Sequence, residues 1–201
     1  GASRVLRSSS QEHLSDDLIS VAQAVSWTSS DGETVHGFYY APKNPEFTAP
    51  EGSLPPLLVN VHGGPTSSAR PGLSIAVQYW TSRGFAFLDV NYRGSTGYGR
   101  KYRQRLNGHW GVLDVQDCAE GAQYLVSQGL ADPERIAIRG RSSGGYTVLS
   151  ALADSDVFTA GTSLFGIGDL KLLEATTHKF ESHYDQFLIG SDDLSDPVWA
   201  E

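Results

Sequence analysis

The stretch Gly140-Arg141-Ser142-Ser143-Gly144-Gly145 decides how this sequence is interpreted. A short apolar segment, residues 135–139, precedes it, and apolar residues with helical spacing, residues 146–154, follow it. A serine between a buried strand and a helix, with glycines two positions before and after it, is typical of a nucleophile elbow, a sharp turn that exposes the serine hydroxyl. The same residues also fit a Gly/Ser-rich loop that caps a helix, so the hexapeptide alone leaves both interpretations open.

In the first interpretation the glycines have a steric purpose. Where a strand turns sharply into a helix, side chains beside the serine would collide, and Gly140 and Gly144 remove them. Gly145 allows an even closer approach at the start of the helix. The free N–H groups of that helix start favour an anion beside Ser142.

A second glycine-rich turn follows another apolar segment. Residues 57–62 predict a buried strand, and Gly63-Gly64-Pro65 comes directly after it. Main-chain N–H groups at this point can face a ligand, so we expect an oxyanion hole made by the amide of Ser143 and that of Gly64 or Gly63. A simple tight turn is the alternative. His62 lies inside this loop, which suits it better to bracing the loop than to acting as a general base.

Composition favours a single α/β domain. The 201 residues include 39% hydrophobic residues and 22 glycines, enough for a buried core. The formal net charge of -8 argues against nucleic acid and anionic membranes as partners. The one cysteine, Cys118, is expected in the core and suits a reducing, cytoplasmic compartment. No run of 18 apolar residues occurs, so no membrane span is predicted.

The chain divides into a polar start and a patterned remainder. Residues 1–18 are aperiodic, and we interpret them as a linker or as the tail of a preceding domain. In residues 19–201, two β-prone segments flank Ser29-Ser30-Asp31-Gly32, which predicts an antiparallel hairpin. Strands and helices then alternate, with strands at 57–62, 85–90, 135–139 and 158–165 and helices at 73–82, 112–128 and 146–154. This alternation predicts a doubly wound, mostly parallel sheet.

Three segments occur in a characteristic order: Asn60-Val61-His62-Gly63-Gly64-Pro65, then Asn91-Tyr92-Arg93-Gly94-Ser95-Thr96-Gly97-Tyr98-Gly99, then Gly140-Arg141-Ser142-Ser143-Gly144-Gly145-Tyr146. Together they resemble the catalytic domain of the prolyl oligopeptidase family of serine peptidases, and most of all its acylaminoacyl-peptidase and dipeptidyl-aminopeptidase branch. The resemblance implies an α/β-hydrolase fold that cleaves short peptides through an acyl-enzyme on Ser142. It also implies a β-propeller before this domain, with residues 1–18 as its tail or as the link from it.

The rest of the catalytic triad is expected beyond Glu201. In α/β-hydrolases the order along the chain is Ser, Asp, His, and the resemblance places the Asp and His farther from Ser142 than this chain extends. His178 and His183 are the only histidines after Ser142, and they lie in a segment that resembles the family's substrate-pocket region. We therefore expect the 201-residue chain alone to be inactive, because a serine without a base is a poor nucleophile.

The same shortening predicts an α/β-hydrolase sheet that lacks its C-terminal strands. The strand at 158–165 is then an unpaired edge, which exposes backbone hydrogen-bonding groups. We expect this edge to be covered by the missing C-terminal segment or by a second chain.

Three residues are candidates for substrate binding. Phe180 and Tyr184 are four positions apart, so on a helix both rings lie on one face and could line an apolar pocket; core packing is the alternative. Arg93 could bind a substrate carbonyl or carboxylate, or form an ion pair with a local acid.

Two other functions share the main features of this sequence. A carboxylesterase of the same fold uses the same elbow, and a noncatalytic hydrolase-like binding module needs no base. No cofactor or metal is expected, because the sequence contains neither a dinucleotide-binding or phosphate-binding glycine motif nor a zinc-binding pattern.

Overall fold

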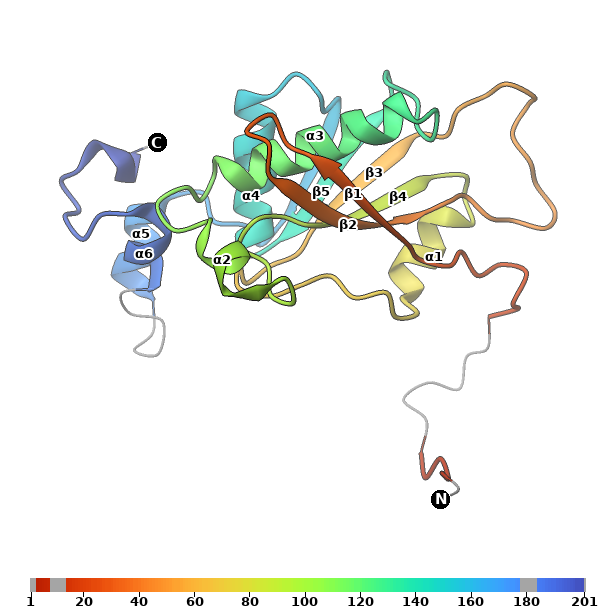
Figure 1. The fold of residues 1–201 in the computed structure, drawn as a ribbon, viewed down its shortest axis with the longest axis horizontal. Helices are drawn as coiled ribbons and strands as arrows, with labels where there is room; N and C mark the ends of the chain where they lie inside the picture. The colour runs from red at the N-terminus through yellow and green to blue at the C-terminus, as the bar shows by residue number, and fades with distance from the viewer. Residues whose placement is uncertain (1–2, 8–13, 178–183, 201) are drawn as a thin grey trace.

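The computed structural model describes residues 3–7, 14–177 and 184–200. These residues form a six-stranded sheet in the order β1-β2-β4-β3-β5-β6 (Figure 1). The strands are β1 (Gln23–Thr28), β2 (Thr34–Tyr40), β3 (Leu57–Val61), β4 (Ala86–Asn91), β5 (Ile136–Arg141) and β6 (Ala160–Leu164). The helices are α1 (Ile75–Thr81), α2 (Gly99–Gln104), α3 (Leu113–Ser127), α4 (Ser143–Asp154), α5 (Leu170–Thr176) and α6 (Tyr184–Ile189), with a 3-10 turn η1 at Pro197–Ala200.

The predicted antiparallel hairpin is present at the start of the sheet. Strands β1 and β2 pair with Thr28 opposite Thr34, and Gly32 in the turn has a φ of 84°. Glycine adopts this left-handed conformation without steric cost, which is why Asp-Gly suits the turn. Strand β2 then pairs antiparallel with β4 and joins the hairpin to the rest of the sheet.

Strands β4, β3, β5 and β6 are parallel, as predicted. Strand β3 is central, with β4 on one side and β5 on the other. The chain passes from β3 outward to β4 and from β5 outward to β6, so the direction of the connections reverses between β3 and β5. The loops at the carboxyl ends of neighbouring parallel strands meet at such a switch point, where open α/β sheets bind their ligands. This arrangement brings the loop after β3 and the turn after β5 to the same edge.

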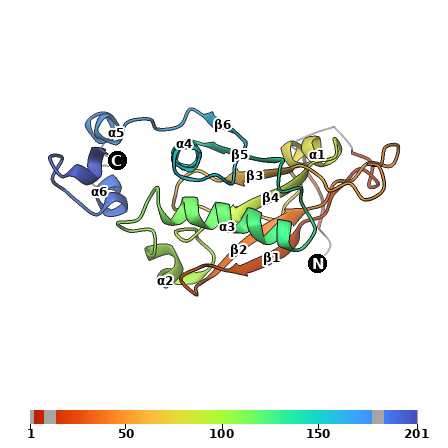
Figure 2. The ribbon, with the colours of Figure 1, turned by 90° about the horizontal axis from the view of Figure 1, so that it is seen from above.

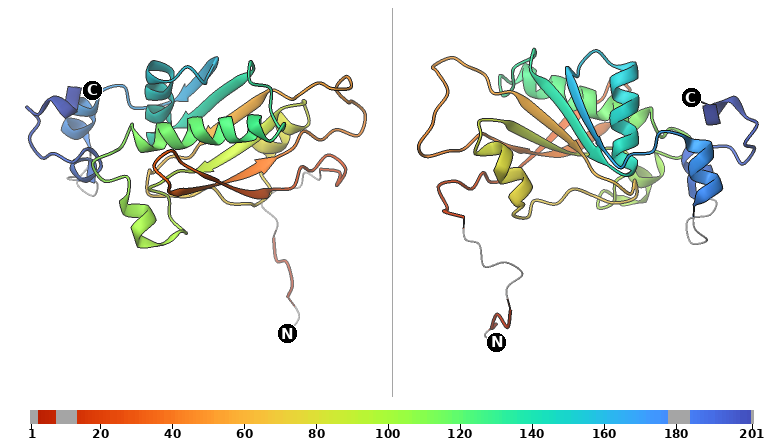
Figure 3. Two further views of the ribbon diagram at one scale, coloured as in Figure 1. Left: turned by 45° about the horizontal axis from the view of Figure 1, so that its top comes forward. Right: turned by 180° about the vertical axis from the view of Figure 1, so that it is seen from behind.

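Helices cover both faces of the sheet. Figure 3 shows α3 and α1 on opposite faces, and α4 packs beside α3 against β5 and β6. The alternation of side chains along β3 follows this layering, because Leu57, Val59 and Val61 join the main core while Leu58 packs with Val77 of α1. Cys118 on α3 is completely buried in the main core, as expected.

The residues after β6 extend beyond the sheet. Figures 1 and 2 show α5 and α6 past the end of the sheet at which the chain turns from β5 into α4. Loop residues after α2 reach this region, since the amides of Gly108 and Trp110 donate hydrogen bonds to carbonyls of α6 at 3.0 and 3.3 Å. No helix within the described ranges combines the length and the apolar character needed to cross a membrane.

Candidate active site

Ser142 occupies a sharp bend between β5 and α4. Strand β5 ends at Arg141 and α4 begins at Ser143, so the whole change of direction falls on this one residue. Its φ of 55° and ψ of -125° lie in a region that residues other than glycine rarely adopt. The amide of Ser142 donates to the carbonyl of Leu164 at 3.1 Å, which ties the bend to the end of β6. Ser142 is exposed, and the predicted strand-to-helix corner is confirmed.

The glycines around Ser142 allow main-chain segments to touch. A Cβ atom on Gly140 would lie 2.2 Å from the carbonyl oxygen of Gly144, and one on Gly144 would lie 2.4 Å from that of Val61. A Cβ atom on Gly145 would lie 2.6 Å from the Cα of Gly166. Real Cβ contacts are never this short, so each position requires glycine, and α4 packs directly on the main chain of β3.

The Gly63-Gly64 loop lies beside the bend, as the oxyanion-hole prediction requires. A Cβ atom on Gly63 would be 3.0 Å from the carbonyl oxygen of Arg141 and 3.5 Å from the Cβ of Ser142. Ser143 is the first residue of α4, so its amide has no acceptor within the helix. Within residues 3–7, 14–177 and 184–200, the Gly64 amide also donates no hydrogen bond. Both amides therefore remain candidates for binding a developing oxyanion.

His62 braces this loop. Its Nδ1 lies 2.8 Å from the carbonyl oxygen of Gly63, and its Nε2 lies 2.7 Å from Oγ of Ser95. Burial lowers the pKa of His62 to about 4, so the ring is neutral at pH 7. A carbonyl only accepts, so Nδ1 carries the proton and Nε2 accepts from the Ser95 hydroxyl. With both nitrogens engaged, His62 is unsuited to act as the base for Ser142.

Sequence reasoning missed two residues that hold His62. The Tyr92 ring stacks on the imidazole, with centroids 4.4 Å apart, and its hydroxyl donates to the carbonyls of His62 and Pro65 at 3.1 and 3.3 Å. Ser95 is the other residue and is completely buried. Both belong to the Asn91-to-Gly99 segment, which is rich in glycine and aromatic residues. That composition was the signal in the sequence that could have identified them.

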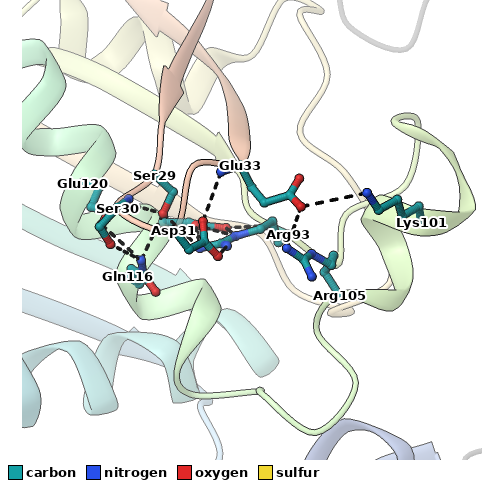
Figure 4. Close-up of polar contacts among 10 residues, drawn as sticks. Ser29, Ser30, Asp31, Glu33, Arg93, Lys101, Arg105, Gln116 and Glu120 are labelled. Carbon is teal, nitrogen blue, oxygen red and sulfur yellow. Dashed lines mark hydrogen bonds and ion pairs between the residues drawn. The ribbon is translucent and has the colours of Figure 1, made fainter.

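Arg93 forms the buried ion pair that the sequence left open as an alternative, and not a substrate contact. Its side chain is 1% exposed, and Nη2 lies 2.6 Å from Oδ1 of Asp117 on α3. Asp31 in the hairpin turn is a second partner, also drawn in Figure 4. Burial raises the pKa of Asp117 to about 6 while hydrogen bonds from Arg93 oppose this, so both groups are charged at neutral pH. A guanidinium that is already paired and buried has no free face for substrate, so these contacts favour the ion-pair alternative for Arg93.

Tyr184 lies next to the Gly63-Gly64 loop. Its hydroxyl contacts the side chain of Thr66 and accepts from the Thr66 amide at 3.3 Å. Thr66 follows Gly63-Gly64-Pro65 directly, so α6 reaches the edge of the sheet where Ser142 lies. Phe180, His178 and His183 lie outside the described residues, so the predicted pairing of Phe180 with Tyr184 stays a prediction.

Comparison with known proteins identifies the class to which this fold and site belong. The model of the prolyl oligopeptidase family matches residues 71–197, more than half of the chain. The chain therefore belongs to the prolyl oligopeptidase family.

Individual relatives agree with this assignment. The chain is 37% identical over 122 residues to dipeptidyl aminopeptidase BIII of Pseudoxanthomonas mexicana, covering 60% of this chain and 18% of that protein. It is 34% identical over 157 residues to the acylamino-acid-releasing enzyme of Arabidopsis thaliana, covering 72% and 20%.

Two solved structures are similar over nearly the whole chain. A puromycin-hydrolyzing peptidase of Mycobacterium tuberculosis is 48% identical, with a TM-score of 0.90, over 93% of this chain and 28% of that one. An acylaminoacyl peptidase of Pyrococcus horikoshii is 31% identical, with a TM-score of 0.79, over 91% and 29%. The chain thus spans less than a third of the length of these relatives.

Proposed function

We propose that this chain carries the nucleophile and oxyanion hole of a serine peptidase that cleaves short peptides. The observation that carries the proposal is the bend at Ser142, where φ is 55°, with the Ser143 amide and the Gly63-Gly64 loop beside it. Among the described residues, neither the Ser143 amide nor the Gly64 amide donates a hydrogen bond. A hydroxyl held in this way is positioned to add to a carbonyl, and amides fixed beforehand stabilise the charge that develops.

In the proposed reaction, Oγ of Ser142 attacks the carbonyl carbon of the scissile amide. The carbonyl oxygen becomes an oxyanion, which accepts hydrogen bonds from the amides of Ser143 and Gly64, with Gly63 as the alternative donor. The base takes the proton of the Ser142 hydroxyl during the attack and gives it to the leaving nitrogen, so that collapse of the intermediate expels the amine and leaves an acyl group on Ser142. Water then releases the acyl group by the same steps.

The base for this reaction is proposed to lie beyond Glu201, together with the aspartate that orients it. Three histidines are present in the described ranges, His36, His62 and His109, and none of them has a hydrogen bond to Ser142 there. The family order Ser, Asp, His supports this placement. Tyr184, with Phe180, remains the proposed wall of an apolar pocket for the substrate residue before the scissile bond.

Two further features belong to the proposal. In the described part of the chain β6 pairs only with β5, and we expect its outer edge to pair with a following segment of the same protein or with a second chain.

The buried, unpaired thiol of Cys118 favours a reducing compartment such as the cytoplasm.

The test is active-site labelling of the full-length protein with a fluorophosphonate. Labelling that disappears in Ser142→Ala supports the proposal, and an unlabelled protein contradicts it and favours a noncatalytic module. Turnover of a short peptide amide then separates a peptidase from a carboxylesterase, which hydrolyses only the matching acyl ester. The 201-residue chain alone serves as a comparison and is expected to label far more slowly.

A further inference from the structure

The Arg93–Asp117 ion pair holds both the side chain and the main chain of Arg93. Nε of Arg93 lies 2.9 and 3.1 Å from the two carboxylate oxygens of Asp117, and Nη2 lies 2.6 Å from Oδ1. The main-chain amide of Arg93 donates to Oδ2 of the same carboxylate at 2.7 Å. Both side chains are buried, at 1% and 0% exposure. One carboxylate on α3 therefore fixes the position of the chain just after β4.

Tyr92 and Ser95, which flank Arg93 and Gly94, both contact His62. Tyr92 stacks on the imidazole, and Ser95 donates to its Nε2 at 2.7 Å. The amide of Ser95 donates to the carbonyl of Tyr92 at 2.9 Å, which closes a tight turn over Arg93 and Gly94. Holding Arg93 in place therefore holds both groups that orient the His62 ring.

His62 in turn orients a candidate oxyanion donor. Its Nδ1 donates to the carbonyl of Gly63 at 2.8 Å. That carbonyl belongs to the same planar peptide unit as the Gly64 amide, so fixing one end of the unit fixes the direction of the other. A continuous set of contacts thus joins Asp117 to the Gly64 amide.

We propose that the Arg93–Asp117 ion pair is a positioning device for the oxyanion hole, acting through the Tyr92–Ser95 turn and His62 on the Gly64 amide. This inference rests on the proposed function, because it assigns the Gly64 amide to the oxyanion. It gives Arg93 and Asp117 a role in the transition state without contact with substrate.

The opposite side of Arg93 offers a matched control. There Arg93 contacts Asp31 and Ser29 of the hairpin turn, and Glu120 on α3 accepts hydrogen bonds from Ser29 and Ser30 (Figure 4). Glu120 is one turn of α3 from Asp117, and its contacts lead to the hairpin, which reaches the guanidinium of Arg93 through Ser29. Glu120→Gln therefore changes a charge in the same cluster but leaves every contact between Asp117, Arg93, the Tyr92–Ser95 turn and His62 in place.

The experiment compares three variants in the full-length protein: Asp117→Asn, the double variant Arg93→Met with Asp117→Leu, and Glu120→Gln. The double variant guards against a simple folding failure, since replacing a buried ion pair by apolar residues of similar size often preserves stability. Each protein is assayed for kcat and KM on a peptide amide. Each is also assayed for affinity toward a peptide aldehyde, whose adduct with serine has an oxyanion, and toward the corresponding product peptide, which has none.

We expect kcat and aldehyde affinity to fall together by about 10- to 100-fold in Asp117→Asn and in the double variant, somewhat less than complete loss of an oxyanion donor causes. In these two variants, KM and the affinity for the product peptide are expected to stay within about threefold of the wild-type values. Glu120→Gln is expected to match the wild type in kcat, KM and both affinities. General structural damage lowers both affinities, so parallel losses overturn the inference. Wild-type kcat in a folded double variant also overturns it.

The two proposals fail in different ways. A wild-type protein that does not react with a fluorophosphonate contradicts the proposed function. A wild-type protein that reacts, with variants that keep its kcat and aldehyde affinity, contradicts only the positioning role of Arg93 and Asp117.

Discussion

Nδ1 of His62 donates to the carbonyl of Gly63 at 2.8 Å, and that carbonyl shares a peptide unit with the Gly64 amide. His62 has the side chain of a possible catalytic base, but its hydrogen bond orients the main chain of the Gly63-Gly64 loop instead. Because burial lowers its pKa to about 4, this hydrogen-bonding pattern persists throughout the neutral pH range.

Replacing His62 by phenylalanine tests this assignment. Phenylalanine retains an aromatic face for Tyr92 but loses both hydrogen bonds, so the Gly64 amide is no longer held. We expect kcat to fall by about 100- to 1,000-fold, the usual effect of losing one oxyanion donor. Steady-state kinetics on a peptide amide measure it, with His109→Phe as the control, because His109 is exposed and its ring contacts the carbonyl of Asn107 in its own loop. An unchanged kcat in His62→Phe means that another contact orients the loop.

A methyl group at Gly144 is expected to prevent folding. Its Cβ would lie 2.4 Å from the carbonyl oxygen of Val61 at the end of β3 and 2.8 Å from that of His62, which follows it, so the clash cannot be relieved without displacing β3 from α4. Gly144→Ala should lower the free energy of unfolding by more than about 4 kcal/mol, measured by denaturant titration or as loss of soluble protein. Gly72→Ala is the matched control, since a Cβ there has no neighbour within 4 Å. Equal stability of the two variants contradicts the packing described here.

The strained backbone conformation of Ser142 is expected to lower the stability of the protein. Its φ of 55° and ψ of -125° favour glycine, and such strain costs about 1 to 3 kcal/mol. Ser142→Gly should therefore raise the free energy of unfolding by about 1 kcal/mol while abolishing labelling. Ser142→Ala loses the same hydroxyl but keeps the strain, so it should unfold like the wild type. Thermal denaturation of the pair measures the difference, and identical melting temperatures argue against a strained bend.

Asp114 predicts a specific pH dependence of stability. It is completely buried on α3, and it accepts hydrogen bonds from the Gly111 amide at 2.7 Å and from the Thr147 hydroxyl. Burial raises its pKa to about 6 from the usual 3.8, so the folded protein keeps a proton that the unfolded chain has lost between these values. The contribution of Asp114 to stability therefore decreases as pH rises from about 4 to about 6, by up to about 3 kcal/mol, and is constant above that.

Asp114→Asn should remove this contribution. The free energy of unfolding, measured with urea at about pH 4 and at about pH 7, should decrease more between these pH values in the wild type than in the variant. Asp89 and Asp117 also have pKa values raised to about 6 by burial, and because they are present in both proteins the difference isolates Asp114. If Asp114→Asn loses as much stability between these two pH values as the wild type does, a group other than Asp114 causes the pH dependence.

The sheet and the bend were predictable because their signals are local. Continuous apolar segments and the glycines that end them marked β3, β5 and the turn at Ser142 to within a few residues. The first turn of α4 was missed because Gly144 and Gly145 have low helix propensity. They lie in the helix nonetheless, since their lack of a side chain permits contact with β3 and with Gly166.

The contacts that hold the site were beyond local reasoning. Asp117 is 24 positions from Arg93, Asp31 is 62 positions away, and Thr66 and Tyr184 are 118 apart. Nothing in the sequence near Arg93 distinguishes a buried partner on a helix from a substrate in a cleft. Helix α2 was also not predicted, because its sequence, GRKYRQ, has no apolar face and no buried residue.

The close approach of α4 to β3 and of Gly145 to Gly166 has an evolutionary consequence. The bend at Ser142 is held by main-chain groups that contact other main-chain groups, so its geometry does not depend on which side chains surround it. If Ser142 is the nucleophile, as proposed, the side chains around it can be exchanged during divergence and give new substrate preferences without disturbing the chemical step.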